Sequence, residues 1–176
     1  WYTRFYGTPP AEQFRIVIGF VNGPSCYGPS RQLVGQSKEV FSIIGYAANR
    51  KGQPVLMADL GTVVHEFNHS FIKIEGDTKN ALAKSGKTIK SYSAFCMKQQ
   101  AYDSWQTILE ESLVRAAEKC YFIEHGDGKV DKGIRNEMNH GFFWMPELVQ
   151  TLRYYESHRK KYPTFTSFYP EIIRFF

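Results

Sequence analysis

The sequence predicts an α+β fold, in which a small mixed or antiparallel sheet packs on one helix and the C-terminal half is helical. Two observations support this prediction. Short β-branched and aromatic runs occupy the N-terminal third, and apolar residues at helical spacing begin at Leu60 and recur toward the C-terminus. The chain has 176 residues without a Pro/Gly/Ser-rich linker or an internal repeat, so we expect one domain over residues 1–176.

Two strands are predicted before the first long helix. Phe14–Val21 is apolar and β-branched and stops at an Asn-Gly-Pro turn signal, and Val40–Ala47 has the same character. Ser25–Ser37 carries Gly, Pro and Ser and predicts a loop, and the polar Asn49–Pro54 predicts a turn.

Helical periodicity follows. One stripe predicts a helix that Asp59 caps and Gly76-Asp77 ends; it consists of Leu60, Val63, Val64, Phe67, Phe71 and Ile74. Further helices are expected over about Tyr102–Tyr121 and Pro146–Lys161, with a short final helix or cap over Ser167–Phe176.

Two segments carry no apolar stripe. The polar, Lys-rich Lys79–Lys90 predicts an exposed, irregular segment, and Gly126, Gly128 and Gly133 predict a loop.

Composition excludes several classes of protein. The net charge is +5 and the pI is about 9.1, but the cations are scattered and the densest run is only Arg159-Lys160-Lys161, so no nucleic-acid partner is expected. Apolar runs such as Phe41–Ala48 are too short for a transmembrane segment. The chain begins at Trp1 without Met or a signal peptide, which predicts a mature or trimmed chain.

Three widely spaced cysteines form neither a disulfide framework nor a metal knuckle. They are Cys26, Cys96 and Cys120. We expect buried apolar thiols, with one disulfide left open as an alternative.

The residues that carry chemistry are His65-Glu66-Phe67-Asn68-His69, an H-E-x-x-H motif. Residues four apart on a helix lie only about 40° apart around its axis, so both imidazoles can reach one metal ion. Glu66 is rotated about 100° from His65, so it can act as general base toward water without binding the metal. The motif therefore predicts a zinc site with His65 and His69 as ligands and Glu66 as the catalytic residue.

The third zinc ligand is less directly defined. The glycine and third histidine of the H-E-x-x-H-x-x-G-x-x-H pattern are replaced by Ile72 and Glu75. A glutamate from a later helix is the other route, and Glu110 and Glu111 provide it. We prefer Glu111, because Arg115 lies one turn further on and can orient its carboxylate, with Glu110 and Glu75 as alternatives.

Several residues are weaker candidates. His140, Tyr102 or Tyr121 can stabilise an oxyanion during attack on a carbonyl, and the sequence does not choose among them. His125 is expected to be solvated. The segment DGKVDKG around Asp127 lacks the acidic positions and closing glutamate of a calcium loop, so no calcium site is predicted.

Three segments resemble a family of bacterial HExxH domains of unknown function, mostly from exported proteins. These segments are VVHEFNHSF, ESLVRAAEKCYF and the C-terminal stretch from GFFWMPELVQ onward, which contains the pattern Y-E-x-x-R-x-x-Y-P-T. The resemblance covers roughly Phe14–Phe176 and implies a zincin-like metalloprotease fold, a metal site and an exported location, periplasmic, cell-surface or secreted. Glu111 stands at the glutamate of its E-x-L-V-R-A motif. The strand over residues 41–46 would then be the edge strand that binds an extended peptide.

Together these features predict a zinc-dependent metallohydrolase, specifically a gluzincin-type peptidase, that acts on a peptide or protein. Two alternatives stay open. One is a zinc-holding but inactive module that binds peptide or glycan, and the other is a purely structural module of a larger exported protein.

Overall fold

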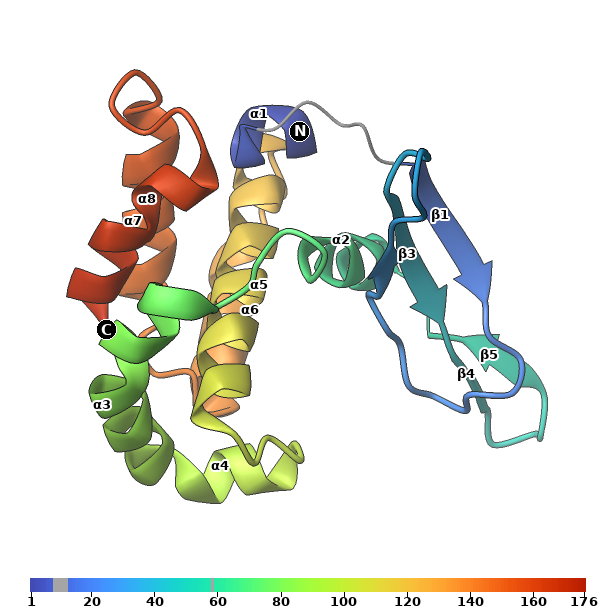
Figure 1. Cartoon of the computed structure of the whole chain (residues 1–176). Helices are drawn as coiled ribbons and strands as arrows, with labels where there is room; N and C mark the ends of the chain where they lie inside the picture. Colours follow the sequence, from blue (N-terminus) through green and yellow to red (C-terminus); the bar gives the residue numbers. More distant parts are fainter. Residues whose placement is uncertain (8–12, 58) are drawn as a thin grey trace. The chain divides into compact units, whose positions relative to one another are not determined.

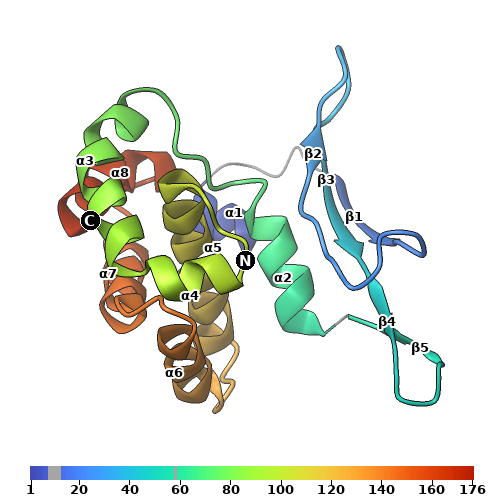
Figure 2. The ribbon, with the colours of Figure 1, turned by 90° about the horizontal axis from the view of Figure 1, so that it is seen from below.

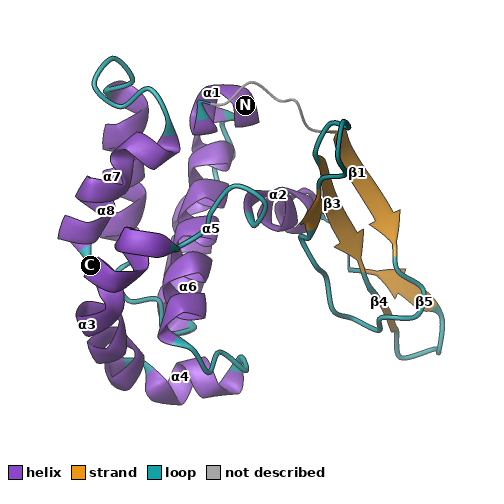
Figure 3. Ribbon diagram, viewed as in Figure 1, coloured by secondary structure: helices purple, strands orange, loops and turns teal. Residues whose placement is uncertain are grey.

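A computed structural model of the chain describes residues 1–7, 13–57 and 59–176 (Figure 1). It divides into two compact units, one formed by Trp1–Thr8 and Lys73–Phe176 and the other by Pro9–Ile72. We call them the helical unit and the strand unit, because all strands of the described residues lie in the second (Figure 3). The predicted mixed α+β character is confirmed, and the expectation of one domain stays a prediction.

The strand unit holds two small sheets and one helix. Its elements are β1 (Gln13–Ile18), β2 (Ser30–Arg31), β3 (Glu39–Ile44), β4 (Tyr46–Ala48), β5 (Pro54–Leu56) and α2 (Leu60–Asn68). β3 pairs in parallel with β1 and antiparallel with β2, so the predicted small mixed sheet is present (Figure 2). β4 and β5 form an antiparallel hairpin around the predicted turn.

The predicted edge role of residues 41–46 is wrong, because β3 lies between β1 and β2. Alternate residues of β3, Val40, Ser42 and Ile44, are buried, as expected of a strand with one face covered, and β3 packs against α2. The predicted strand Val40–Ala47 is in fact two strands in two sheets, separated at Gly45, whose amide donates to Cys26 Sγ over 3.4 Å.

The helical unit contains the other helices of the described residues. They are α1 (Tyr2–Tyr6), α3 (Gly76–Tyr92), α4 (Ala94–Gln99), α5 (Trp105–Glu124), α6 (Val130–Asn139), α7 (Met145–Ser157) and α8 (Phe165–Phe175). The long, largely buried α5 contacts α3, α6 and α7 (Figure 1). The three predicted helices of this half are therefore confirmed, although α7 ends four residues before its predicted limit.

Two segments expected to be irregular are helices. Lys79–Lys90 lies within α3, which the apolar pattern missed because its buried stripe contains Gly86 where a large side chain would be expected. A Cβ at Gly86 would lie 2.4 Å from Trp105 Cε3, so the tryptophan ring fills that place. The predicted loop at Gly133 lies within α6, whose buried residues are only Val130 and the charged Glu137.

The helix that carries the H-E-x-x-H motif is shorter than its apolar stripe predicted. It ends at Asn68, where residues to Ile74 were expected. Turn bonds from the Ser70 amide to the Phe67 carbonyl (3.1 Å) and from the Phe71 amide to the Asn68 carbonyl (3.0 Å) follow its last turn. The helical bond from Ile74 to Ser70 is not formed, because both of its groups are taken elsewhere. The Ser70 carbonyl accepts from Lys38 Nζ (3.0 Å), and the Ile74 amide donates to Glu110 Oε1 (2.9 Å).

The segment with the pattern Y-E-x-x-R-x-x-Y-P-T anchors the N-terminal helix. Tyr155 and Arg159 both donate to the carbonyl of Phe5, Arg159 over 2.6 Å, and Arg159 also donates to the Pro163 carbonyl. Thr164 caps α8 in a reciprocal pair of bonds with Ser167. These residues therefore have structural roles, because they hold α1 and start α8.

The prediction of buried thiols is confirmed for Cys120 and is wrong for Cys26 and Cys96. All three cysteines are free, with Cys120 buried and the other two half-buried. Within residues 1–7, 13–57 and 59–176, no helix has both the length and the apolar composition that crossing a bilayer requires.

We expect Arg159→Ala to lower the free energy of unfolding by about 1–3 kcal/mol, because two carbonyls lose a charged donor. Urea denaturation of the full chain measures the change. Arg153→Ala is the matched control, since Arg153 is an exposed arginine of α7 that pairs with Glu156 one turn away, and its removal should cost less than about 1 kcal/mol. Equal losses in the two variants would contradict the anchoring role.

Candidate functional site

The motif helix α2 is held in place by a cap and an apolar face. Asp59 Oδ1 accepts from the Thr62 amide over 2.7 Å, as predicted, and so satisfies one of the open donors of the first turn. Val64 and Phe67 are buried, and the Phe67 ring contacts Phe14 of β1 edge-on at 5.0 Å. The sheet therefore fixes the rotation of α2 about its axis.

The structure brings His65 and His69 together at the C-terminal end of α2. Their Nε2 atoms lie 3.2 Å apart, and both side chains are half-buried. His69 follows the last helical residue but keeps right-handed helical dihedral angles, so the i,i+4 relation survives the early end of the helix. The predicted convergence of the two imidazoles is thus present in the strand unit.

Glu66 lies on the same helix and is buried, with 7% of its surface exposed. Its backbone is packed against a loop residue that the sequence did not single out. A Cβ at Gly28 would lie 1.9 Å from the Glu66 carbonyl oxygen and 3.0 Å from His69 Cβ. Only glycine allows the loop to pack this closely on the motif helix. The sequence signal was weak, since Gly28 is one of two glycines in the predicted loop Ser25–Ser37.

Glu111 lies in the helical unit, on α5, where it is 7% exposed. The predicted i,i+4 contact is present, with Arg115 Nε 3.4 Å from Glu111 Oε2. The same guanidinium donates to Glu137 Oε2 (2.7 Å) and Tyr102 Oη (3.1 Å) and lies over the Phe142 ring at 4.8 Å. Arg115 is therefore fixed from several sides.

The sequence analysis did not identify Glu137 as a partner of Arg115, because no helix was predicted around Glu137. Glu137 accepts from Arg115 and also pairs with Lys119 at 3.2 Å, and all three side chains are largely buried. Burial opposes the charge on Arg115, but the nearby Glu137, Tyr102 and Glu111 outweigh it and raise the pKa of the guanidinium. We call Glu111, Arg115, Glu137, Lys119 and Tyr102 the buried charge network.

Tyr102, one of the candidates for oxyanion stabilisation, belongs to this network. Burial, together with the negative charge of Glu111, raises its pKa to about 12. The hydroxyl is therefore protonated at neutral pH and is able to donate a hydrogen bond.

The alternative third ligands have other roles. Glu110 Oε1 accepts from the Ile74 amide (2.9 Å) and from Gln106 Nε2 (3.3 Å), so its carboxylate connects α5 to the segment before α3. Glu75 is exposed and precedes α3 as its N-cap residue. These positions favour Glu111 among the three.

The remaining candidates lie on the surface of the helical unit. His140 is exposed and directly follows α6, whereas the sequence predicted that it follows a loop. His125 is exposed and stacks on Tyr121 at 4.1 Å. Asp127 accepts from the Lys129 amide just before α6, which is a local turn contact.

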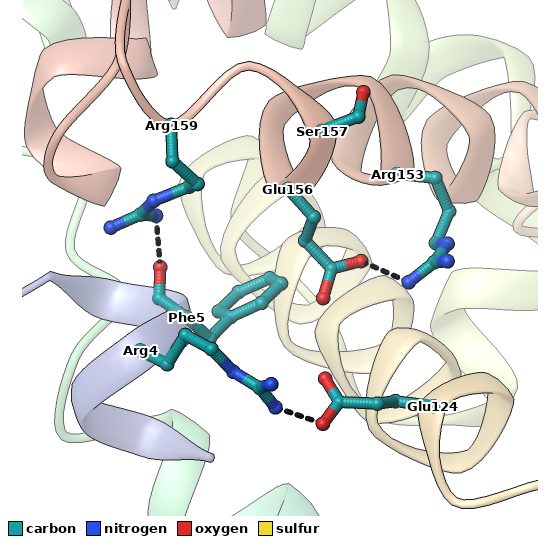
Figure 4. A pocket seen from close by; sticks show the side chains of 7 residues that line it. All are labelled: Arg4, Phe5, Glu124, Arg153, Glu156, Ser157 and Arg159. Carbon is teal, nitrogen blue, oxygen red and sulfur yellow. Dashed lines mark hydrogen bonds and ion pairs between the residues drawn. The ribbon is translucent and has the colours of Figure 1, made fainter.

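A cavity of about 320 Å³ in the helical unit contains none of the predicted site residues (Figure 4). It is lined by Arg4, Phe5, Glu124, Arg153, Glu156, Ser157 and Arg159. Four of its charged groups form two pairs, Arg4 with Glu124 and Arg153 with Glu156, and Arg159 donates to the Phe5 carbonyl. Burial raises the pKa of Glu156. These pairs and the bond from Arg159 indicate a packing role at the junction of α1, α5 and α7.

Gly28→Ala should lower the free energy of unfolding by about 1–3 kcal/mol, because the added methyl group overlaps the backbone of α2. Thermal or urea unfolding of the full chain measures it. In the matched control Gly128→Ala the added Cβ has no neighbour within 4 Å, and stability should be nearly unchanged. If Gly28→Ala were as stable as the control, the close packing on α2 would be disproved.

Glu137→Ala should destabilise the chain by about 3–5 kcal/mol, because Arg115 and Lys119 then lose a buried anionic partner. Urea denaturation followed by circular dichroism tests this expectation. Asp131→Ala removes an exposed carboxylate from the same helix and should cost no more than about 1 kcal/mol. A loss for Glu137→Ala as small as that of the control would argue against the buried charge network.

Comparison with known proteins identifies the family. A search of the curated proteins and a search of the solved structures each find no match. The model of the family described as "Domain of unknown function (DUF4932)" matches residues 3–175, nearly the whole length of both units. The chain therefore belongs to the DUF4932 family.

Proposed function

We propose that this chain is a zinc-dependent metallohydrolase, specifically a gluzincin-type peptidase with a zincin-like fold that acts on peptide or protein substrates. His65 and His69 of the strand unit and Glu111 of the helical unit are the zinc ligands in this proposal, and Glu66 is the catalytic residue. An exported location, which the sequence resemblance implies, belongs to the same proposal.

The observation that carries the proposal is the 3.2 Å separation of His65 Nε2 and His69 Nε2. Zinc binds histidine nitrogen at about 2.0–2.1 Å, and two such ligands of a tetrahedral ion lie about 3.3 Å apart. The donor set agrees with zinc chemistry, since two imidazoles and one carboxylate leave a fourth position for water. The residues of the chain therefore fit the ion.

Support for Glu111 as third ligand comes from its surroundings in the helical unit. A ligand carboxylate has to be ionised and fixed in orientation, and Arg115 provides both a positive charge and a rigid contact. Because Arg115 is itself held by Glu137 and Tyr102, its guanidinium cannot easily turn away. Glu110, by contrast, is occupied by the Ile74 amide.

The proposed mechanism assigns proton transfer to Glu66. Zinc, when bound, supplies a Lewis acid that increases the acidity of water and polarises the scissile carbonyl. Glu66 takes a proton from the attacking water and gives it to the amine nitrogen as the carbon–nitrogen bond breaks. His65 and His69 keep their positions through the packing of α2 on the sheet.

Purified without chelator, the wild-type chain should contain about one zinc ion per chain, which elemental analysis measures. His65→Ala should lose the ion, and Glu111→Gln should weaken zinc binding at least about tenfold, because removing a ligand exceeds the usual effect of removing its supporting contact. Glu110→Gln is the matched control and should retain zinc.

Failure of the wild-type chain to bind zinc would refute the proposed metal site. The 3.2 Å contact would then be a hydrogen bond between the two imidazoles, and the structural module would be the better interpretation. Zinc loss in Glu110→Gln with retention in Glu111→Gln would reassign the third ligand.

Glu66→Gln separates catalysis from metal binding. It should retain zinc and lose about 10²–10⁴-fold in the hydrolysis of a mixed peptide library, because the amide cannot accept the proton. Mass spectrometry of the products measures the rate. Zinc binding without hydrolysis by the wild type would support an inactive binding module instead.

A further inference from the structure

The positive charge of this chain is concentrated in one segment of the helical unit. Residues 76–100, which form α3 and α4, contain five lysines against a single acidic residue, Asp77, whereas the net charge of the whole chain is +5. The lysines are Lys79, Lys84, Lys87, Lys90 and Lys98, and all are exposed. Because the segment folds into helices, Lys84 and Lys87 fall on one side of α3.

Helical geometry places two of these lysines on the same side of α3 as an exposed aromatic side chain. Lys84, Thr88 and Tyr92 are spaced i, i+4, i+8 and form one row, and Lys87 lies three residues from Lys84 on the same side. This side is opposite the buried Leu82 and Gly86. Lys90 is less available, because its Nζ donates to the Asp103 carbonyl.

Large aromatic side chains continue this surface across the end of α3 and α4. Tyr92 and Phe95 are each 78% exposed, and Phe143 is 43% exposed and meets Tyr92 edge-on at 5.8 Å. The segment before α7 is held against α4, since the Gln100 side chain donates to the His140 carbonyl over 2.6 Å. We call Lys84, Lys87, Tyr92, Phe95, Lys98 and Phe143 the lysine–aromatic face.

We propose that the lysine–aromatic face binds the surface of an anionic lipid bilayer. Lysines near such a surface are attracted to the lipid phosphates, and tyrosine and phenylalanine side chains enter the headgroup region. The complementarity of charge is the argument for this partner. The chain is held peripherally in this mode, because α3 and α4 lie on the membrane without crossing it.

The type of cation favours lipid over nucleic acid. Residues 76–100 contain no arginine, although arginine is the side chain that binds phosphate and base edges in a bidentate manner. Lysine acts as a flexible point charge, which suits the diffuse potential of a lipid surface. Residues 76–100 have a net charge of +4, from five lysines and one aspartate, whereas the net charge of the whole chain is +5. Most of the excess positive charge therefore lies in this one segment.

Co-sedimentation of the full wild-type chain with phosphatidylcholine vesicles containing about one-third phosphatidylglycerol tests this proposal. We expect binding to these vesicles, little binding to pure phosphatidylcholine, and release at about 0.5 M salt. Lys84→Glu/Lys87→Glu should lower the partition coefficient at least about tenfold, since each lysine contributes about fivefold. Tyr92→Ser/Phe95→Ser should also weaken binding while leaving the charge unchanged.

The matched control is Lys129→Glu/Lys132→Glu, which reverses two exposed lysines at the start of α6 in the same unit. It should bind within about twofold of the wild type. Circular dichroism establishes that each variant is folded. The proposal is overturned by absence of binding to the anionic vesicles, by equal loss in the control, or by preference for a single-stranded oligonucleotide over vesicles. None of these outcomes depends on zinc.

Discussion

The burial of Arg115 is the constraint on which the helical unit depends. A guanidinium removed from water must be paired and hydrogen-bonded, or its desolvation would destabilise the fold. Glu137, Tyr102 and Glu111 meet this requirement, and they come from α6, the loop before α5 and α5 itself. The cation therefore fixes α6 against α5 and at the same time orients the carboxylate that we propose as a zinc ligand.

A second requirement concerns the aromatic side chains at the N-terminus. Phe5 and Tyr6 of α1 are buried in the helical unit, where Phe5 packs edge-on against Tyr155 at 5.6 Å. Such a short helix has little stability of its own, so the bonds from Tyr155 and Arg159 to the Phe5 carbonyl are needed to hold it. The pattern near the C-terminus that contains Tyr155 and Arg159 therefore has a structural role in holding α1.

The strand unit places the two histidines by a different means. The i,i+4 spacing sets their relation, but their position depends on Gly28, Phe14 and Phe67, which seat α2 between a loop and the sheet. The site that we propose thus combines an imidazole pair with a carboxylate that has its own separate support. In this proposal, a substitution in either unit can remove zinc by removing a ligand or by unfolding the unit that holds it. The free energy of unfolding of the variant distinguishes these two causes.

The sequence by itself determined the mixed α+β character, the helix cap at Asp59, the convergence of His65 and His69, and the contact between Glu111 and Arg115. The cap and the two side-chain pairs each join residues at most four positions apart, where helix geometry is decisive. Tertiary structure decided the rest. Glu137 and Gly28 owe their roles to long-range packing, and α3 is stabilised by Trp105 over Gly86. The predicted helix does not continue to Ile74, because the Ser70 carbonyl and the Ile74 amide bond to Lys38 and Glu110 instead of to each other. Apolar periodicity cannot report such contacts, since they involve glycine, charge and distant partners.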